Sequence, residues 1–383
     1  MKLPTSYPGM IGLFLATLIV GCDSNPSPTV VPEEPATSAA GVTVESDAVA
    51  SRAVQMSRKA SASVGDPAAQ CSAGGAQACR TLCDAQAAVC NKDSSEYDKD
   101  DCKSASKDVP VCPSDPARME LGSLCRLPPT ALSPTQGAVG MLAVTCKARD
   151  LEDKEEDAGW KLRRYLMARP VPVVVSPDLF GQNQARLYLT DHHHLATGLL
   201  ISDVPDEDKQ LYICPMSNRR SDESSTFWRY MENNNFTWLH NARGEDIPPN
   251  ELPPSLETIA DDPYRTLSRW VRDSCGYIKC GKECGGDGED TSDLARCEAC
   301  STAPYFLEFR WADYMRGNSP TCEVPADVYS MSTTEQAAVL PAKLPCLMDA
   351  ARGPEALVDG LPGWNDGLIT PKQVQLDADG CEE

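Results

Sequence analysis

The chain has 383 residues, and its 35 Lys and Arg against 56 Asp and Glu give a formal net charge of −21 at pH 7. At about 100–200 residues per domain, this length accommodates two or three compact units. An acidic surface repels phosphate backbones, so the charge excludes a general nucleic-acid binder that relies on a strong basic patch. With 41% hydrophobic residues, the composition indicates a folded protein and excludes an integral membrane bundle.

The amino terminus predicts export and lipid anchoring. An apolar run, Met10–Val20, follows Lys2 and is too short to span a bilayer, which is typical of a signal peptide over residues 1–21. The letters IVGC at 19–22 resemble the lipobox of bacterial lipoproteins, in which the cysteine receives a lipid such as palmitate and the chain is cut before it. We expect the mature protein to begin at Cys22, lipid-anchored to the cell membrane or outer membrane on its periplasmic or surface side. The alternative is an ordinary secretory signal with a chance cysteine.

The next two segments differ in composition. Residues 22–65 are rich in Pro, Ser, Thr, Ala, Val and Glu and show no period of 2 or 3.6, which predicts a disordered tether. Residues 66–125 hold seven of the chain's 18 cysteines. Thiols in an oxidising compartment usually pair, so this segment is predicted to be a disulfide-braced helical module, with a metal site as the alternative.

The cysteine spacing in this module indicates a helix over Ala76–Asn91. On such a helix three cysteines would share one face and could pair with either of two later ones. The three are Cys79, Cys83 and Cys90, and the two later ones are Cys102 and Cys112.

From residue 126 to residue 365 the pattern is that of a globular α+β domain, followed by a tail over 366–383. Strands come first and helices follow with short connections, an order that favours α+β over α/β. The expected strands are 171–175, 186–190 and 210–214, and the expected helices are 150–168, one opened by Asp191, 224–233, 254–260, 263–274, 305–316 and 335–351.

Three of the four histidines are consecutive, and they stand at a predicted strand-to-helix junction. Asp191 precedes His192, His193 and His194. Asp191 could cap the helix, and the N–H groups behind it would suit an anion such as phosphate. A carboxylate beside imidazoles suffices for general acid–base chemistry or for part of a divalent-metal site. The alternative is a solvated histidine run, or a cap with one buried imidazole bonded to the backbone.

Several segments, in this order, resemble the ParB-like nuclease family of the ParB/sulfiredoxin superfamily. They are LSPTQ at 132–136 with Val139-Gly140, RPVPV at 169–173, LYLTDHHHLA at 187–196, FWRYM at 227–231, LPPSL at 252–256, DDPYRTL at 261–267, FRWAD at 309–313 and GLPG at 360–363. The resemblance covers about 127–365. It implies a compact α+β domain whose cleft lies beside the junction at 191–194 and handles phosphate.

The chain also departs from related proteins of this superfamily in several motifs. The basic GERR-like motif of ParB and the reactive cysteine of sulfiredoxin are both missing at the junction, and no helix-turn-helix follows residue 316. Thiol attack and operator binding are therefore not expected. Thr135 and Gln136 could line the cleft, or Thr135 could cap a turn. Arg265, Arg269 and Arg310 are candidate phosphate clamps, because a guanidinium fork matches phosphate oxygens, or they are ordinary solvated or salt-bridged side chains.

A second cysteine cluster lies inside the resembling region, as an insertion over 275–303. Its pattern is C-x4-C-x3-C-x12-C-x2-C, formed by Cys275, Cys280, Cys284, Cys297 and Cys300. Disulfides are expected for an exported chain, with zinc as the alternative. Without Cys22, 18 − 1 = 17 cysteines remain, and this odd number leaves at least one unpaired or bonded between chains.

Two functions from different classes are compatible with these observations. The first is a hydrolase of phosphate esters or nucleic acid that acts through Asp191–His194, with the metal requirement undetermined. The second is a non-catalytic binding or structural module of the cell envelope on the same fold. The intact Asp-His-His-His run favours the first, and the acidic charge favours the second if the ligand is a polyanion.

Overall fold

The structure is a computed structural model that describes residues 67–155, 159–181, 184–277, 306–318, 321–353, 361 and 374–382. The predicted signal peptide, Cys22, the tether, most of the insertion at 275–303 and half of the tail lie outside these residues. No helix in the described ranges has the length and apolar character that crossing a membrane requires.

A five-stranded mixed sheet forms the centre of the fold. Its order is β1 (Cys125–Leu127), β6 (Leu211–Asn218), β4 (Val171–Val175), β5 (Leu187–Leu189) and β2 (Leu132–Ser133), with neighbours alternately antiparallel and parallel. Only Pro128–Ala131 separates β1 from β2, although these strands form opposite edges of the sheet. Because so few residues span only a short distance, the sheet must curl until its edges approach each other. The predicted α+β class is confirmed.

The central strand β4 explains why the sheet is buried on both faces. All five of its residues, VPVVV, are buried, and β-branched side chains pack well on a pleated surface. A parallel two-stranded sheet, β3 (Ala138–Val139) with β7 (Ala260–Asp261), lies outside the main one. The strands predicted at 171–175, 186–190 and 210–214 all form, with small differences at their ends.

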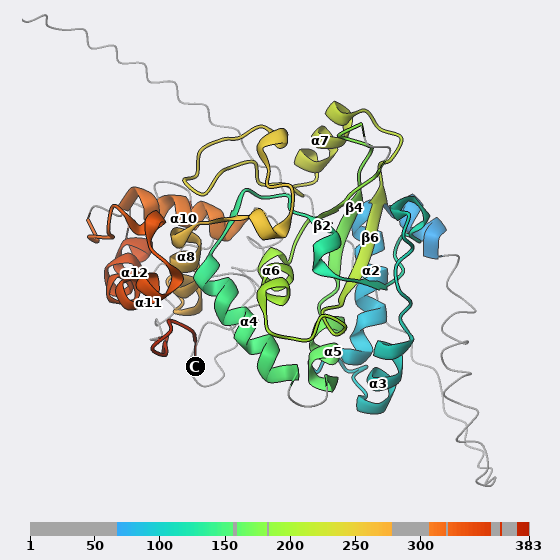
Figure 1. Cartoon of the computed structure of the whole chain (residues 1–383), viewed down its shortest axis with the longest axis horizontal. Coiled ribbons are helices and arrows are strands. Elements are labelled where there is room, and N and C mark those ends of the chain that lie inside the picture. Colours follow the sequence, from blue (N-terminus) through green and yellow to red (C-terminus); the bar gives the residue numbers. More distant parts are fainter. Residues whose placement is uncertain are drawn as a thin grey trace, which may run out of the picture. The chain divides into compact units, whose positions relative to one another are not determined.

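The cysteine-rich segment packs against the sheet instead of forming a core of its own. Its helices are α2 (Pro67–Ala87) and α3 (Lys99–Asp108), and α2 lies beside β6 (Figure 1). Buried cysteines of α2 share one hydrophobic cluster with the strands.

The disulfides correct two of the predicted pairings, because neither Cys79 nor Cys83 pairs with Cys102 or Cys112. Cys90 pairs with Cys102, as the spacing allowed, and Cys112 pairs with Cys125 of β1. Cys83 pairs with Cys214 in β6, 131 residues away, and not with a cysteine of its own segment. Sequence spacing could not anticipate this bond because the packing of α2 on the sheet creates it. Cys71–Cys79, Cys146–Cys381 and Cys322–Cys346 are the other disulfides among the described residues.

The helix predicted over 150–168 is wrong. Two helices occupy the region, α4 (Met141–Glu155) and α5 (Trp160–Met167). Gly159 adopts φ 64 in front of α5, a left-handed conformation that glycine accepts without steric cost and that interrupts the helix. The helix expected over 254–260 is also absent, since 256–258 is a 3-10 turn and β7 follows it.

The remaining helices build a second core. They are α8 (Pro263–Asp273), α10 (Leu307–Asn318), α11 (Thr333–Val339) and α12 (Leu344–Arg352), and α7 (Ser224–Asn233) lies nearer the sheet (Figure 1). The rings of Tyr277 and Trp311 stack inside this core, with centroids 4.5 Å apart and planes 6° apart. The helix expected over 335–351 is divided into α11 and α12 by a 3-10 turn that contains Pro341, which cannot donate a backbone hydrogen bond.

Candidate functional site

The histidine run lies where β5 gives way to α6 (His193–Ile201), as predicted. The N-cap of α6 is His192, which adopts φ 66, in the left-handed region. Asp191 does not cap the helix, which corrects that expectation. Its Oδ1 atom instead accepts a hydrogen bond of 2.6 Å from the backbone N–H of His192, and this contact secures the tight turn. The side chain of Asp191 is exposed and that of His192 is half-buried.

His193 points into the protein and holds the segment that begins at Thr135. Its Nε2 atom accepts a hydrogen bond of 3.1 Å from the Thr135 backbone N–H. The Thr135 hydroxyl, which donates to the Leu189 carbonyl at 2.7 Å, lies 3.3 Å from the same nitrogen. Burial lowers the pKa of His193 to about 3, although the Asp191 carboxylate opposes this shift. The imidazole is therefore neutral near pH 7, with its proton on Nδ1.

His194 likewise accepts a hydrogen bond from the backbone, five residues after Thr135 at Gly140. Its Nε2 atom accepts a hydrogen bond of 3.2 Å from the Gly140 backbone N–H. Burial lowers the pKa of His194 well below its usual value, and the positive charges of Arg265 and Arg269 lower it further. Gly140 is required here, because a Cβ atom would lie 2.5 Å from Thr266 Oγ1 and 2.7 Å from the Thr266 backbone nitrogen.

Thr135 and Gln136 come back to the junction, where both are buried. The Thr135 carbonyl accepts hydrogen bonds from the Trp238 backbone N–H and the Thr237 hydroxyl, at 2.9 and 2.7 Å. Gln136 forms a β-bridge with Trp238. The N–H, the carbonyl and the hydroxyl of Thr135 thus all form hydrogen bonds within the structure that surrounds His193.

Arg265 is the most unusual side chain near the junction. It is 8% exposed, yet its Nε and Nη1 atoms have no hydrogen-bond partner in the described part of the chain. Its Nη2 atom lies 3.9 Å from Oε2 of Glu308, and its guanidinium sits 5.1 Å from the centroid of the Phe309 ring. Burial lowers the pKa of Arg265, and Glu308 opposes the shift. Glu308 is shared, because Arg272 Nη1 binds its Oε1 at 2.8 Å.

The other two predicted arginines differ from Arg265. Arg269 lies one turn along α8, and its Nε atom is 3.4 Å from Asp273 and 3.5 Å from Glu382 of the carboxyl-terminal segment. Arg310 is exposed on α10 and forms no ion pair with any described residue. The structure thus brings Arg265 and Arg269 toward His194 but gives Arg310 no contact with them.

Sequence reasoning missed Glu308, Phe309 and the Gly140 N–H. Glu308 and Phe309 directly precede Arg310 in a segment that the family resemblance covers, so that segment contained the only available signal. A backbone N–H has no sequence signature at all. The Nε2 atoms of His193 and His194 accept backbone hydrogen bonds and are therefore already used. No group of three or more His, Cys, Asp or Glu suited to a metal ion occurs among the described residues.

Comparison with known families agrees with this geometry. Residues 125–283 match the model of a family described as "Putative ParB-like nuclease". This part of the chain is therefore similar to the ParB-like family. The ParB-like match begins at β1 and includes the junction, Arg265 and Arg269, but it ends before Arg310.

Comparisons with individual proteins add less. The chain is similar to a solved structure, the crystal structure of protein Atu1540 from Agrobacterium tumefaciens, with 25% identity and a TM-score of 0.43 over 63% of this chain and 97% of that one. The comparison with curated proteins found no match.

Proposed function

We propose that the ParB-like domain binds a phosphate ester at Arg265 and hydrolyses it at the Asp191–His194 junction. The observation that carries the proposal is the buried Arg265 guanidinium, two of whose nitrogens have no hydrogen-bond partner among the described residues. Leaving such a charged donor unpaired costs at least about 1–3 kcal/mol, a cost that a bound anion would offset. A guanidinium fork matches phosphate oxygens, and the family assignment points to the same chemistry.

The roles proposed for the three histidines follow from their contacts. His193 and His194 are positioning residues, because their Nε2 atoms hold the backbone at Thr135 and Gly140. His192 is then the proposed general base, half-buried at the mouth of the junction and next to the Asp191 carboxylate. Asp191 is proposed to orient it through the turn that the two residues form.

The proposed reaction needs only water as co-reactant. A water oxygen forms a new bond to phosphorus while the bond from phosphorus to the ester oxygen breaks. The proton that water loses passes to the imidazole of His192, which later releases it to solvent, and the leaving alkoxide takes a proton from solvent water to become the alcohol. Arg265 would stabilise the negative charge that gathers on the phosphoryl oxygens. A small ester is favoured over a nucleic acid, because the net charge of −21 repels a polyanion.

The hydrolysis of bis(p-nitrophenyl) phosphate by the full chain tests this proposal, with and without Mg²⁺ or Mn²⁺. We expect His192→Gln to lower kcat by about 10²-fold or more. The control is His240→Gln, since His240 is the fourth histidine, lies outside the 191–194 run and contacts Asp246 through its Nδ1 atom. No turnover in any condition, with the fold intact, would exclude this hydrolysis. Phosphate binding without turnover would then favour the non-catalytic module.

The cellular location follows in part from the disulfides. Six disulfides in the described residues indicate an oxidising, extracytoplasmic environment. We further propose that a lipid on Cys22 anchors the chain to a membrane. Labelling of growing bacteria with palmitate tests this, since Cys22→Ser is expected to abolish incorporation, and equal labelling of the variant would contradict it.

A further inference from the structure

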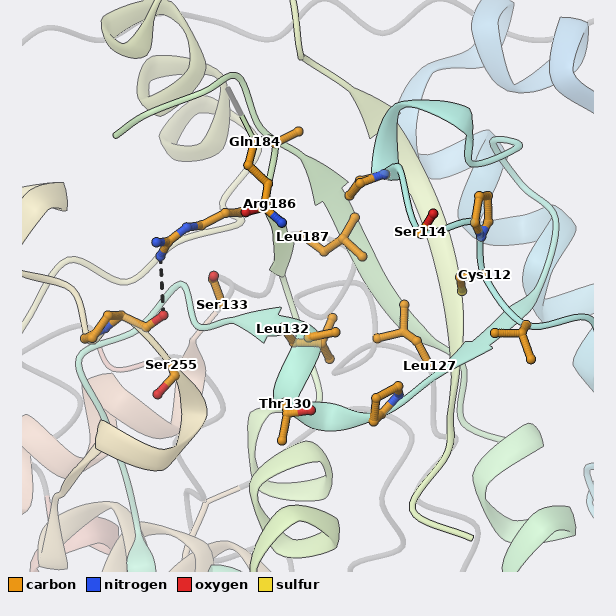
Figure 2. Close-up of a pocket in the computed structure, with 17 residues that line it drawn as sticks. Cys112, Ser114, Leu127, Thr130, Leu132, Ser133, Gln184, Arg186, Leu187 and Ser255 are labelled. Carbon is orange, nitrogen blue, oxygen red and sulfur yellow. Dashed lines mark hydrogen bonds between the residues drawn. The ribbon is translucent and has the colours of Figure 1, made fainter. Parts of the chain in front are cut away.

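A cavity lies where the two edges of the curled sheet approach each other. Its volume is about 470 Å³, within the range of small-molecule sites, and none of its lining residues belongs to the site around Arg265. Figure 2 shows the lining side chains, which come from β1, β2 and β5 and from the connecting segments 111–116, 128–131, 184–186 and 254–255. A ligand bound in this cavity would therefore not contact the residues proposed to carry out hydrolysis.

One end of the cavity is apolar. Leu127 ends β1, Leu132 begins β2 and Leu187 begins β5, so the three leucines meet where the sheet curls (Figure 2). Val111 also lines the cavity and is 69% exposed, which is unusual for a large aliphatic side chain. Proline residues at 113, 116 and 128 are further apolar members of the lining. This end can remove a hydrocarbon chain from water.

The other end is polar and positively charged. The hydroxyl groups of Ser133 and Ser255 lie on the same side of the cavity as the Arg186 guanidinium (Figure 2). Among the described residues, Arg186 is the only charged one that lines the cavity, and it forms no ion pair with any other of them. Its Nη1 atom reaches the Pro254 carbonyl at 3.5 Å, and its guanidinium stacks 4.1 Å from the centroid of the Phe180 ring. These contacts orient the guanidinium while leaving its charge without a carboxylate.

We propose that this cavity binds a small amphipathic carboxylate, with its carboxylate at Arg186 and its hydrocarbon chain on Leu127, Leu132 and Leu187. The fork of an arginine matches a carboxylate, and the apolar end would disfavour a second charge. A neutral apolar ligand would leave the guanidinium unpaired. A polyanion would place negative charge next to the three leucines, where it would lose its hydration. The net charge of −21 also repels a polyanion.

Calorimetry on the full chain with straight-chain carboxylates from butanoate to octanoate tests the proposal, with the matched alcohols as controls. We expect affinity to rise about fourfold per added methylene until the cavity is filled. Each carboxylate is expected to bind at least about tenfold more tightly than its alcohol. Arg186→Gln should remove this difference. Arg310→Gln is the matched control, because it neutralises an exposed arginine that does not line the cavity.

A second variant tests the apolar end without disturbing the core. Val111→Asp places a negative charge at an exposed position that lines the cavity, so it should abolish carboxylate binding with an unchanged thermal midpoint. Three results would each overturn the proposal: no binding of any member of the series, equal binding of carboxylates and alcohols, or unchanged binding by Arg186→Gln. Because no phosphate takes part, failure here leaves the proposal for Arg265 unaffected.

Discussion

The Nε2 atom of His193 accepts a hydrogen bond from the backbone N–H of Thr135 at 3.1 Å, although 58 residues separate the two. This bond and the parallel one from the Gly140 N–H to His194 fasten the loop after β2 to the start of α6. The conformation of the junction therefore depends on neutral imidazoles as acceptors. Any protonation of these nitrogens would break the contacts that shape the candidate site.

Loss of the acceptor at residue 193 should destabilise the fold. His193→Leu leaves the buried Thr135 N–H without its partner, and we expect the free energy of unfolding to fall by about 1–3 kcal/mol. His193→Gln offers a side-chain oxygen in place of the nitrogen and should retain more of the stability. Urea unfolding measures both. Equal stability of wild type and His193→Leu would show that the bond contributes nothing.

The same histidine predicts a pH dependence of stability. Its pKa is about 3 in the folded protein and 6.5 when unperturbed, so between these values the unfolded chain binds a proton that the folded chain does not. The free energy of unfolding should therefore decrease as the pH falls below 6.5. Asp262 acts in the opposite direction, because burial raises its pKa to about 6. His193→Gln isolates the histidine effect and should lose less stability between pH 6.5 and 4, whereas parallel curves would contradict the assignment.

The disulfide from α2 to the sheet should contribute more stability than the local one. Cys83–Cys214 closes a separation of 131 residues and Cys112–Cys125 one of 13. Loop-closure entropy predicts losses of about 5 and 3 kcal/mol when each pair is replaced by alanine. Chemical denaturation of the two double variants compares them directly. A larger loss for the Cys112–Cys125 pair would show that the long bond does not constrain the unfolded chain as proposed.

Glu382 of the carboxyl-terminal segment should weaken anion binding near Arg269, because its negative charge repels an anion. Glu382 lies 3.5 Å from Arg269, and the Cys146–Cys381 disulfide holds the segment in place. Glu382→Gln removes this negative charge, so affinity for inorganic phosphate should rise by up to about fivefold in calorimetry. Asp379→Asn is the control, because Asp379 pairs with Arg149. An equal increase in the control would indicate a general charge effect.

The local parts of this structure could be predicted from the sequence. The VPVVV strand is a continuous apolar run, and the junction at 191–194 follows from scarce residues at a strand end. The distant partners could not be predicted, because burial creates the bonds from His193 to Thr135 and from Cys83 to Cys214. The helix break at Gly159 could not be predicted either. The apolar period continues through this residue, but its backbone leaves the helical region. The sequence does not distinguish Arg265 from Arg310, because the burial of Arg265 depends on how α8 packs.

The account rests on Arg265 as the anion-binding group, and phosphate-dependent unfolding tests it most directly. Urea unfolding of wild type and Arg265→Met is measured with phosphate and with chloride at equal ionic strength. At a phosphate concentration of 100 times the Kd, wild type should gain about 2.7 kcal/mol over chloride beyond any gain in the variant. Equal phosphate gains in the two proteins would contradict the account.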